Sequence, residues 1–321
     1  MLTKKSLLVL FFVTSYSMAK PLGVIPEIEQ GETRLEIEML SDLWTSPYHR
    51  KDTPQRIAQI ALKVPVLKTD SMRMSFAIEG ENRSHGIPDL TIGDNQVRVG
   101  PQLKNETIGF GFGKVNDDKS SYSIFWARES ASDETFQHRR DIWNAYSAVF
   151  KTAPNQGWNW LYGFQHSGNR GIWNGKTIPL FGFAYQYQPK LTITLGFPFL
   201  RIDWHDDDIH SAAITLTSVG LLGRFQIEVD SDLTIQVRGG LTNRAYSHVN
   251  RLEDDRRLYF EEKVIDVGSM LKLNEYTSYG FHLGYAADRK IFEATTVFSP
   301  IGPVRTVRSD IFGGFEMEYI F

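Results

Sequence analysis

The sequence of 321 residues contains no cysteine. This absence excludes a disulfide framework, a thiolate metal site and a cysteine nucleophile. An excess of charge of one sign is also missing, because 35 basic residues stand against 38 acidic ones and the net charge is −3. A nucleic-acid binder would need a basic surface, so we expect no nucleic-acid partner. The sequence also lacks a phosphate-binding glycine loop, a zinc-binding helix motif and a nucleophile elbow, and we expect no cofactor.

Long apolar runs are absent as well. Beyond residue 19 no run approaches the roughly 20 residues of a membrane helix, which excludes a helical membrane protein. The first residues contain two lysines and then a short apolar run at 7–13. Because Ser17 and Ala19 are small, we expect a signal peptide over 1–19 that is cleaved between Ala19 and Lys20. The alternative is a buried N-terminal helix, which the short core and the charged flank disfavour.

The dominant pattern is an alternation of apolar and other residues at period 2, which is typical of strands. At the C-terminus one face holds Phe315, Met317, Tyr319 and Phe321, and the other holds Gly314, Glu316, Glu318 and Ile320. Segments 157–166, 179–187 and 191–200 alternate in the same way. Few windows fit a helical period better, so the sequence predicts an all-β protein.

About fourteen strands can be placed along the chain. They are expected at 33–43, 56–66, 71–81, 104–114, 121–129, 142–152, 157–166, 179–187, 191–200, 212–229, 233–246, 258–273, 276–287 and 311–321. The defensible range is 12 to 16, because 212–229 could be two strands bent near Gly220 and 291–298 could be a further strand.

The connections between these strands alternate in length. Long ones are expected at 44–55, 82–103, 130–141, 167–178, 201–211, 247–257 and 288–310, with short turns between them. An even strand count with short turns at one end and long loops at the other is typical of a closed antiparallel transmembrane β-barrel with periplasmic turns and extracellular loops. Residues 33–321 would form this barrel, and 20–32 a short periplasmic segment.

The terminal stretch Phe315–Phe321 resembles the last strand of Gram-negative outer-membrane β-barrels, which ends in an aromatic residue. In that superfamily the assembly machinery reads this ending, so the resemblance implies that Phe315, Met317, Tyr319 and Phe321 form an assembly signal. The stretch 178–299 is also similar to outer-membrane barrels classed as uncharacterised. The resemblance implies an exported protein of the cell outer membrane, in contact with the bilayer, lipopolysaccharide and the barrel-assembly machinery.

Closure of the sheet assigns the two faces of each strand, because the apolar face meets lipid and the alternate face meets the lumen. The expected lumen-lining residues are Arg34, Glu36, Glu38, Arg73, Glu79, Arg238, Glu316 and Glu318. Arg128 shares a face with Ile124 and Trp126 and must therefore lie at a rim. Aromatic residues near the strand ends are candidates for the two interfacial girdles. Mixed charges leave open whether the lumen conducts or is closed by ion pairs.

One motif invites a comparison with lipid hydrolases of the outer membrane, which have a His-x-Ser-Asn sequence on a strand. In this chain Ser167 directly follows His166, and Gly168 occupies the place of the hydroxyl. Adjacent residues of a strand point to opposite faces, so we expect no catalytic pair and no enzyme.

A second motif offers imidazole and carboxylate groups in the expected loop 201–211. The residues His205, Asp206, Asp207, Asp208 and His210 are weak candidates for a divalent cation site, although their spacing matches no named site. A solvated acidic loop is the simpler interpretation, and no metal is expected.

The sequence therefore predicts a passive channel or porin-like transporter for small solutes. The alternative is a barrel that transports nothing and serves surface binding, adhesion or envelope integrity. Lipid hydrolysis is the third and weakest hypothesis. The solute and the oligomeric state stay open.

Overall fold

The computed structural model describes residues 34–43, 55–87, 90–169, 172–206, 209–217 and 220–321. The predicted signal peptide with its Ala19–Lys20 cleavage site and the predicted segment 20–32 lie outside these residues. Among the described residues, no helix is long and apolar enough to cross a membrane. Their one short helix is a 3₁₀ turn, η1 (Arg139–Asp141).

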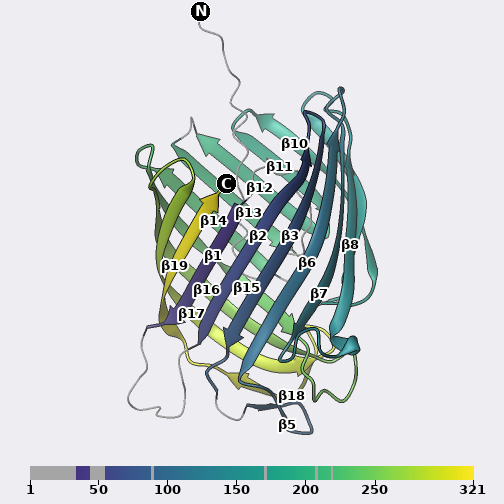
Figure 1. Ribbon diagram of the computed structural model, residues 1–321, viewed down its shortest axis with the longest axis vertical. Coiled ribbons are helices and arrows are strands. Elements are labelled where there is room, and N and C mark those ends of the chain that lie inside the picture. Colours follow the sequence, from purple (N-terminus) through teal and green to yellow (C-terminus); the bar gives the residue numbers. More distant parts are fainter. Residues whose placement is uncertain (1–33, 44–54, 88–89, 170–171, 207–208, 218–219) are drawn as a thin grey trace, which may run out of the picture.

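The described residues form one seventeen-stranded antiparallel sheet and a separate hairpin (Figure 1). The first half of the sheet contains β1 (Arg34–Asp42), β2 (Arg56–Lys68), β3 (Met72–Ser84), β6 (Gln102–Val115), β7 (Ser121–Ser132), β8 (Ile142–Lys151), β9 (Trp158–His166) and β10 (Thr177–Gln188). The second half contains β11 (Leu191–Phe197), β12 (Phe199–Asp206), β13 (His210–Thr217), β14 (Gly220–Glu228), β15 (Leu233–Tyr246), β16 (Arg257–Lys272), β17 (Thr277–Ala294), β18 (Pro300–Thr306) and β19 (Asp310–Ile320). The hairpin pairs β4 (Thr91–Ile92) with β5 (Val97–Arg98).

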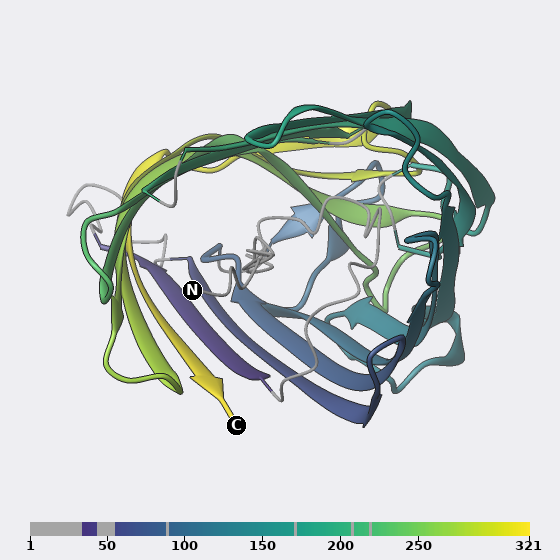
Figure 2. The ribbon, with the colours of Figure 1, turned by 90° about the horizontal axis from the view of Figure 1, so that it is seen from above.

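Sixteen of these strands close into a barrel, and β18 lies outside it. Each barrel strand pairs with the next one along the chain, and β19 pairs with β1 across the closure. The strand β18 pairs with the far end of β17 instead. Figure 2 shows the ring of strands nearly end on. The predicted closed, all-β, antiparallel barrel is confirmed, and its strand count lies at the upper edge of the predicted range.

The register explains why the alternating sequence forms this wall. Along the closure Phe315 pairs with Met39 and Met317 with Ile37, while Glu316 pairs with Glu38. Apolar residues therefore share the outward face, and carboxylates share the inward face. The outward side chains of Phe281 and Leu283 are 61% and 59% exposed. An apolar exterior of this kind is what a barrel in a membrane presents to lipid.

The expected long loop at 201–211 is wrong, because β12 and β13 occupy most of it. Leu200, Ile202 and Trp204 point to one face of β12, and Arg201 and Asp203 point to the other. The expected single strand 212–229 is two strands, β13 and β14, which was the alternative interpretation. These two differences account for the step from fourteen strands to sixteen.

The two ends of the barrel differ. The turn end contains the described chain ends at Arg34 and Phe321 together with most of the short connections, and lies uppermost in Figure 1. The short connections β11–β12 and β13–β14 lie on the loop side. The loop end contains the hairpin β4–β5, η1 and β18, and lies lowermost in the same view. An apolar core fills part of the loop end, with the members Leu90, Ile92, Val99, Leu103, Ala131, Tyr246, Leu258, Phe260 and Ile291.

Candidate functional site: the charged lumen and its mouth

One wall of the lumen, formed by β15, β16, β17, β19 and β1, presents a row of charged side chains. Near the turn end Arg34 Nε lies 2.8 Å from a carboxylate oxygen of Glu318, and a terminal nitrogen of Arg34 lies 3.5 Å from Glu36. The pair of Arg34 with Glu318 joins the first and the last strand of the barrel across its closure. Opposite charges at this separation lower the free-energy cost of placing each of them away from bulk water.

The middle of the same wall holds a second cluster. Arg238 donates through Nε to Asp266 at 2.8 Å and lies 3.9 Å from Glu38. His282 places Nε2 3.1 Å from Glu316 and Nδ1 3.6 Å from Asp266. Arg238 and Glu38 stand four strands apart in the sheet, so their proximity requires the wall to curve sharply here.

Six of the eight lumen residues predicted from sequence belong to this row, namely Arg34, Glu36, Glu38, Arg238, Glu316 and Glu318. The other two, Arg73 and Glu79, lie on β3 on the same face as Glu81. Sequence reasoning missed Asp266 and His282. Both lie on the inward face of strands that were predicted correctly, so their alternation with Val267 and Leu283 could have revealed them.

The wall facing β15 has shorter inward side chains. Gly109, Gly111 and Gly113 alternate along the inward face of β6, and Ser123 and Ala127 continue this face on β7. Packing explains the glycine at position 109, because a Cβ there would lie 2.9 Å from the ring of Phe125. Small residues thus line part of the lumen opposite the charged row, with Phe125 among them, and further charges point inward from β3 and β12.

At the loop end, ion pairs connect strands from opposite sides of the ring. Glu81 of β3 contacts both Arg244 and Tyr246 of β15. Arg83 of β3 donates to Glu262 of β16 at 3.2 Å. All five side chains are buried or nearly so. A third pair joins β17 to β1, because both terminal nitrogens of Arg289 donate to Asp42, at 2.8 and 2.9 Å.

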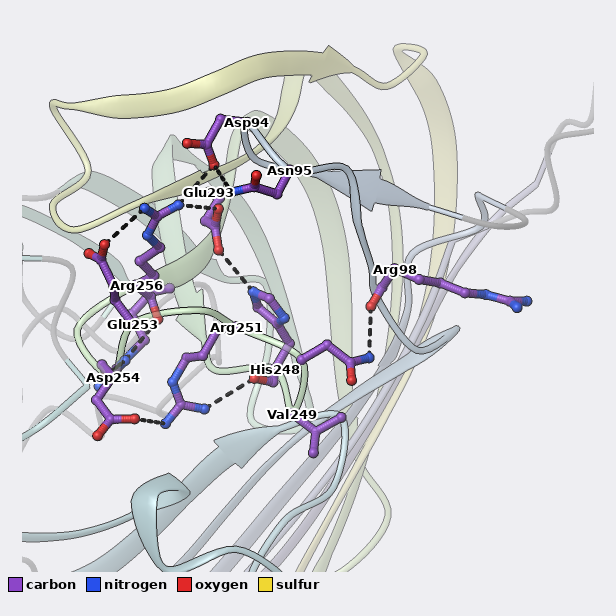
Figure 3. Close-up of polar contacts among 12 residues, drawn as sticks. Asp94, Asn95, Arg98, His248, Val249, Arg251, Glu253, Asp254, Arg256 and Glu293 are labelled. Carbon is purple, nitrogen blue, oxygen red and sulfur yellow. Dashed lines mark hydrogen bonds and ion pairs between the residues drawn. The ribbon is translucent and has the colours of Figure 1, made fainter.

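Above these pairs the loops form a polar network (Figure 3). Glu293 lies 3.2 Å from His248 and 3.3 Å from Arg256, and Arg256 also contacts Asp94 at 3.0 Å. The hydrogen bond from Arg256 holds the pKa of Asp94 below its ordinary value. This network fastens hairpin β4–β5 to the loop that joins β15 and β16.

The two candidate motifs do not assemble. His166 points outward and stacks on Tyr146 with ring centroids 4.5 Å apart, whereas the buried Ser167 donates to Glu129 at 3.0 Å. The two side chains therefore diverge, as the alternation predicts.

In the second motif His205 pairs with Ser211, and Asp206 pairs with His210. His205 and His210 thus lie on opposite faces of the sheet near the turn end, and Asp207 and Asp208 lie outside the described residues. Among the residues described, no group of three or more His, Cys, Asp or Glu side chains could hold a metal ion.

The outward face supplies two further sequence-predicted features. Arg128 is exposed and lies next to Asn144, one outward position beyond the paired Trp126 and Tyr146 toward the loop end. This is the rim position that the alternation requires. The residues of the expected assembly signal run from the middle of β19 to the turn end. Phe315, in the middle, packs against Phe281 with ring centroids 5.6 Å apart. Tyr319 and Phe321 follow it, with ring centroids 4.6 Å apart.

No family model matches the chain, and no curated protein matches it. Solved structures similar to it are outer-membrane barrels. A mutant of the TodX monoaromatic hydrocarbon channel has 10% identity and a TM-score of 0.39, covering 94% of this chain and 93% of the other. An outer membrane channel from Pseudomonas putida F1 has 12% identity and a TM-score of 0.37, covering 92% and 97%. OccAB3 of Acinetobacter baumannii has 7% identity and a TM-score of 0.41, covering 90% and 98%. Values this low say nothing of what this chain does.

Proposed function

We propose that this protein spans the outer membrane as a β-barrel and lets small solutes pass through its lumen. The observation that carries the proposal is the row of inward charges, which runs from Arg34 and Glu318 at the turn end to Asp42 and Arg289 at the loop end. A barrel that served only as an anchor could fill its interior with apolar side chains. Burying so many charges costs free energy, and a water-filled passage beside them reduces that cost.

The outward face supports the membrane part of the proposal. Ile60, Ile78, Ile108 and Ile265 point outward, and each is 42% to 56% exposed. In water such a continuous apolar surface would favour aggregation, whereas in lipid it is stable. The proposed orientation puts the turn end in the periplasm and the loop end outside, next to lipopolysaccharide. The proposed route there is export through a cleaved signal peptide and recognition of the C-terminal strand by the barrel-assembly machinery.

Single-channel recording tests the proposal. The protein is refolded and inserted into a planar bilayer, and the current is recorded across a potassium chloride gradient. Steady steps are expected. Arg34→Ala removes the cation between two carboxylates, so the reversal potential should move toward greater cation preference. The matched control Leu35→Ala changes the next, outward-facing residue of β1 and should leave the current unchanged. Inserted barrels that carry no current, even after the ion pairs at the mouth are removed, would refute the proposal.

A second candidate function is favoured by the contacts that cross the mouth. If the ion pairs of Glu81 and Arg83 with the opposite strands β15 and β16 never separate, the barrel is a closed platform for surface binding or envelope integrity. Such a barrel would insert without conducting, and its activity would lie in the outer loops. Lipid hydrolysis is not proposed, because His166 and Ser167 point apart.

A further inference from the structure

Four strands extend beyond the barrel wall at the loop end. The last pair between β14 and β15 is Leu221 with Leu241, and the last pair between β17 and β19 is Ala286 with Asp310. Beyond these pairs, β15, β16, β17 and β18 bond to one another, at 242–246, 257–262, 288–294 and 300–306. We call this four-stranded piece the extension. At its two edges, the extension runs past the ends of the neighbouring barrel strands β14 and β19.

The extension leans across the mouth and does not continue the wall. Figure 2 shows the strands of this region crossing inside the outline of the ring. Its inward face contacts the opposite side of the barrel through Arg244, Tyr246 and Glu262, which bond to Glu81 and Arg83. Arg83 also lies over the ring of Phe260, 5.1 Å from its centroid.

The other face of the extension is covered as well. Tyr259 and Phe292 stack with ring centroids 5.6 Å apart and belong to a buried cluster with Ile172 of the loop between β9 and β10. At the tip, the Ser247 amide donates to the Ala131 carbonyl of β7 at 2.7 Å. The extension thus divides the loop end of the lumen and is packed on both sides.

The extension begins at an irregularity in the sheet. Glu261 pairs with Lys290, and Lys263 pairs with Ala287, so β17 holds one residue more than β16 over this interval. Asp288, within the extra stretch, has a φ of 51°. A bulge of this kind bends a strand and interrupts the ladder. It bends β17 where the extension begins, while β15 and β16 continue from the wall into the extension without a register shift.

Few backbone bonds fasten the extension to the opposite side. Among the described residues, the Ser247–Ala131 bond is the one backbone link between the tip and the far wall. The other polar attachments to that side involve side chains, among them Glu81 with Arg244, Arg83 with Glu262, Asp141 with Arg251, and Asp133 with the Val249 amide. The apolar core that Leu103 and Ala131 share with Tyr246, Leu258 and Phe260 also joins the two sides. Hairpin β4–β5 is attached to the extension. Asp94 bonds to Arg256, and Gly302 of β18 lies so close to Gly93 that a Cβ there would be 2.5 Å from the Gly93 backbone.

From this arrangement we infer that the extension is a lid over the outer mouth, held shut by an ionic latch. The latch consists of Glu81 with Arg244, Arg83 with Glu262, and Asp42 with Arg289. Solutes pass when these pairs separate and the lid moves away from the opposite wall. The inference rests on the solute passage proposed above, and names the part of the barrel that controls it.

A reversible cross-link tests the lid. The chain contains no cysteine, so the double variant Glu81→Cys/Arg244→Cys has two thiols and no others. Replacing both partners removes the pair without leaving either charge behind. Before cross-linking, the fraction of time open should be higher than in the wild type. A short, reducible bis-thiol reagent should close the channel again, and reduction should reopen it.

A second pair of cysteines, placed away from the lid, shows whether the reagent alone affects the current. Lys190 and Asp206 form an ion pair at the turn end, 2.6 Å apart. Lys190→Cys/Asp206→Cys should conduct as the wild type does before and after the same reagent. If the first variant fails to insert, Asp42→Asn/Arg289→Gln tests another pair of the latch and should also raise the open fraction.

The outcomes distinguish the two proposals. A wild-type current that neither latch variant nor cross-linking alters would overturn the lid and leave solute passage standing. Silence of the wild type and of both unlatched variants, with the barrels shown to be folded and inserted, would overturn solute passage and the lid with it. Opening by the latch variants and closure by the cross-link support both.

Discussion

Placing an arginine on the outward face of β3 should destabilise the protein by an amount that depends on depth in the membrane. Phe76 points outward and pairs with Val64 and Phe110, midway along the strands. Arginine at the midplane of a barrel costs about 2–4 kcal/mol, falling to about 0–1 kcal/mol near the interfaces. Phe76→Arg should therefore lower the free energy of unfolding by about 2–4 kcal/mol. Met72, also outward, pairs with Lys114 near the turn end, so Met72→Arg should cost about 0–1 kcal/mol.

The neighbouring residue supplies the control for this series. Ser75 is exposed and points to the lumen, where it pairs with Gly111 and Pro65. Because water can solvate an arginine there, Ser75→Arg should cost less than about 1 kcal/mol. The assay is urea unfolding from lipid vesicles, followed by tryptophan fluorescence. If Ser75→Arg proves the costly change and Phe76→Arg the tolerated one, the assignment of inward and outward faces is wrong.

Three further results are expected at the loop end. Leu258 is fully buried in the mouth core, so Leu258→Ala should lower the free energy of unfolding by about 2–5 kcal/mol in the same urea assay. Gly93→Ala should speed proteolysis near hairpin β4–β5, because its φ is +71° and a Cβ would lie 2.1 Å from Glu293 Oε2; Gly175→Ala, with φ +67° but no atom within 4 Å, should have a smaller effect. Burial lowers the pKa of His85 from 6.5, so the opened segment binds a proton more readily than the packed one. Proteolysis there should rise as pH falls through 6.5, and His85→Leu should abolish that dependence; equal pH dependence in His85→Leu would contradict this account.

The barrel could be predicted from sequence because its determinant is local. Alternation within each strand fixes which residues face lipid, and a closed sheet is the way in which such strands can cross a membrane. The strand that escaped prediction, β12, alternates as clearly as the others. Its inward residues Arg201 and Asp203 form an ion pair 2.8 Å long. Charged residues in this stretch favour a loop when only the sequence is considered.

In the candidate site too, one part could be predicted from the sequence and another could not. The inward direction of Arg34, Glu36 and Glu316 follows from period 2, so sequence alone was sufficient to place them in the lumen. The lid could not be predicted from the sequence, because Glu81 and Arg244 are 163 residues apart in the chain. Their contact depends on the lean of the extension across the mouth, which no local pattern specifies.

Thiol modification during current recording tests the central claim most directly. Glu36 faces the lumen and Ile37, the next residue, faces lipid. Since the chain has no cysteine of its own, Glu36→Cys and Ile37→Cys each offer one thiol to a charged, membrane-impermeant reagent. The account predicts that the reagent reduces the single-channel current of Glu36→Cys and leaves that of Ile37→Cys unchanged. A current that responds at Ile37→Cys, or at neither position, would contradict solute passage along the charged wall.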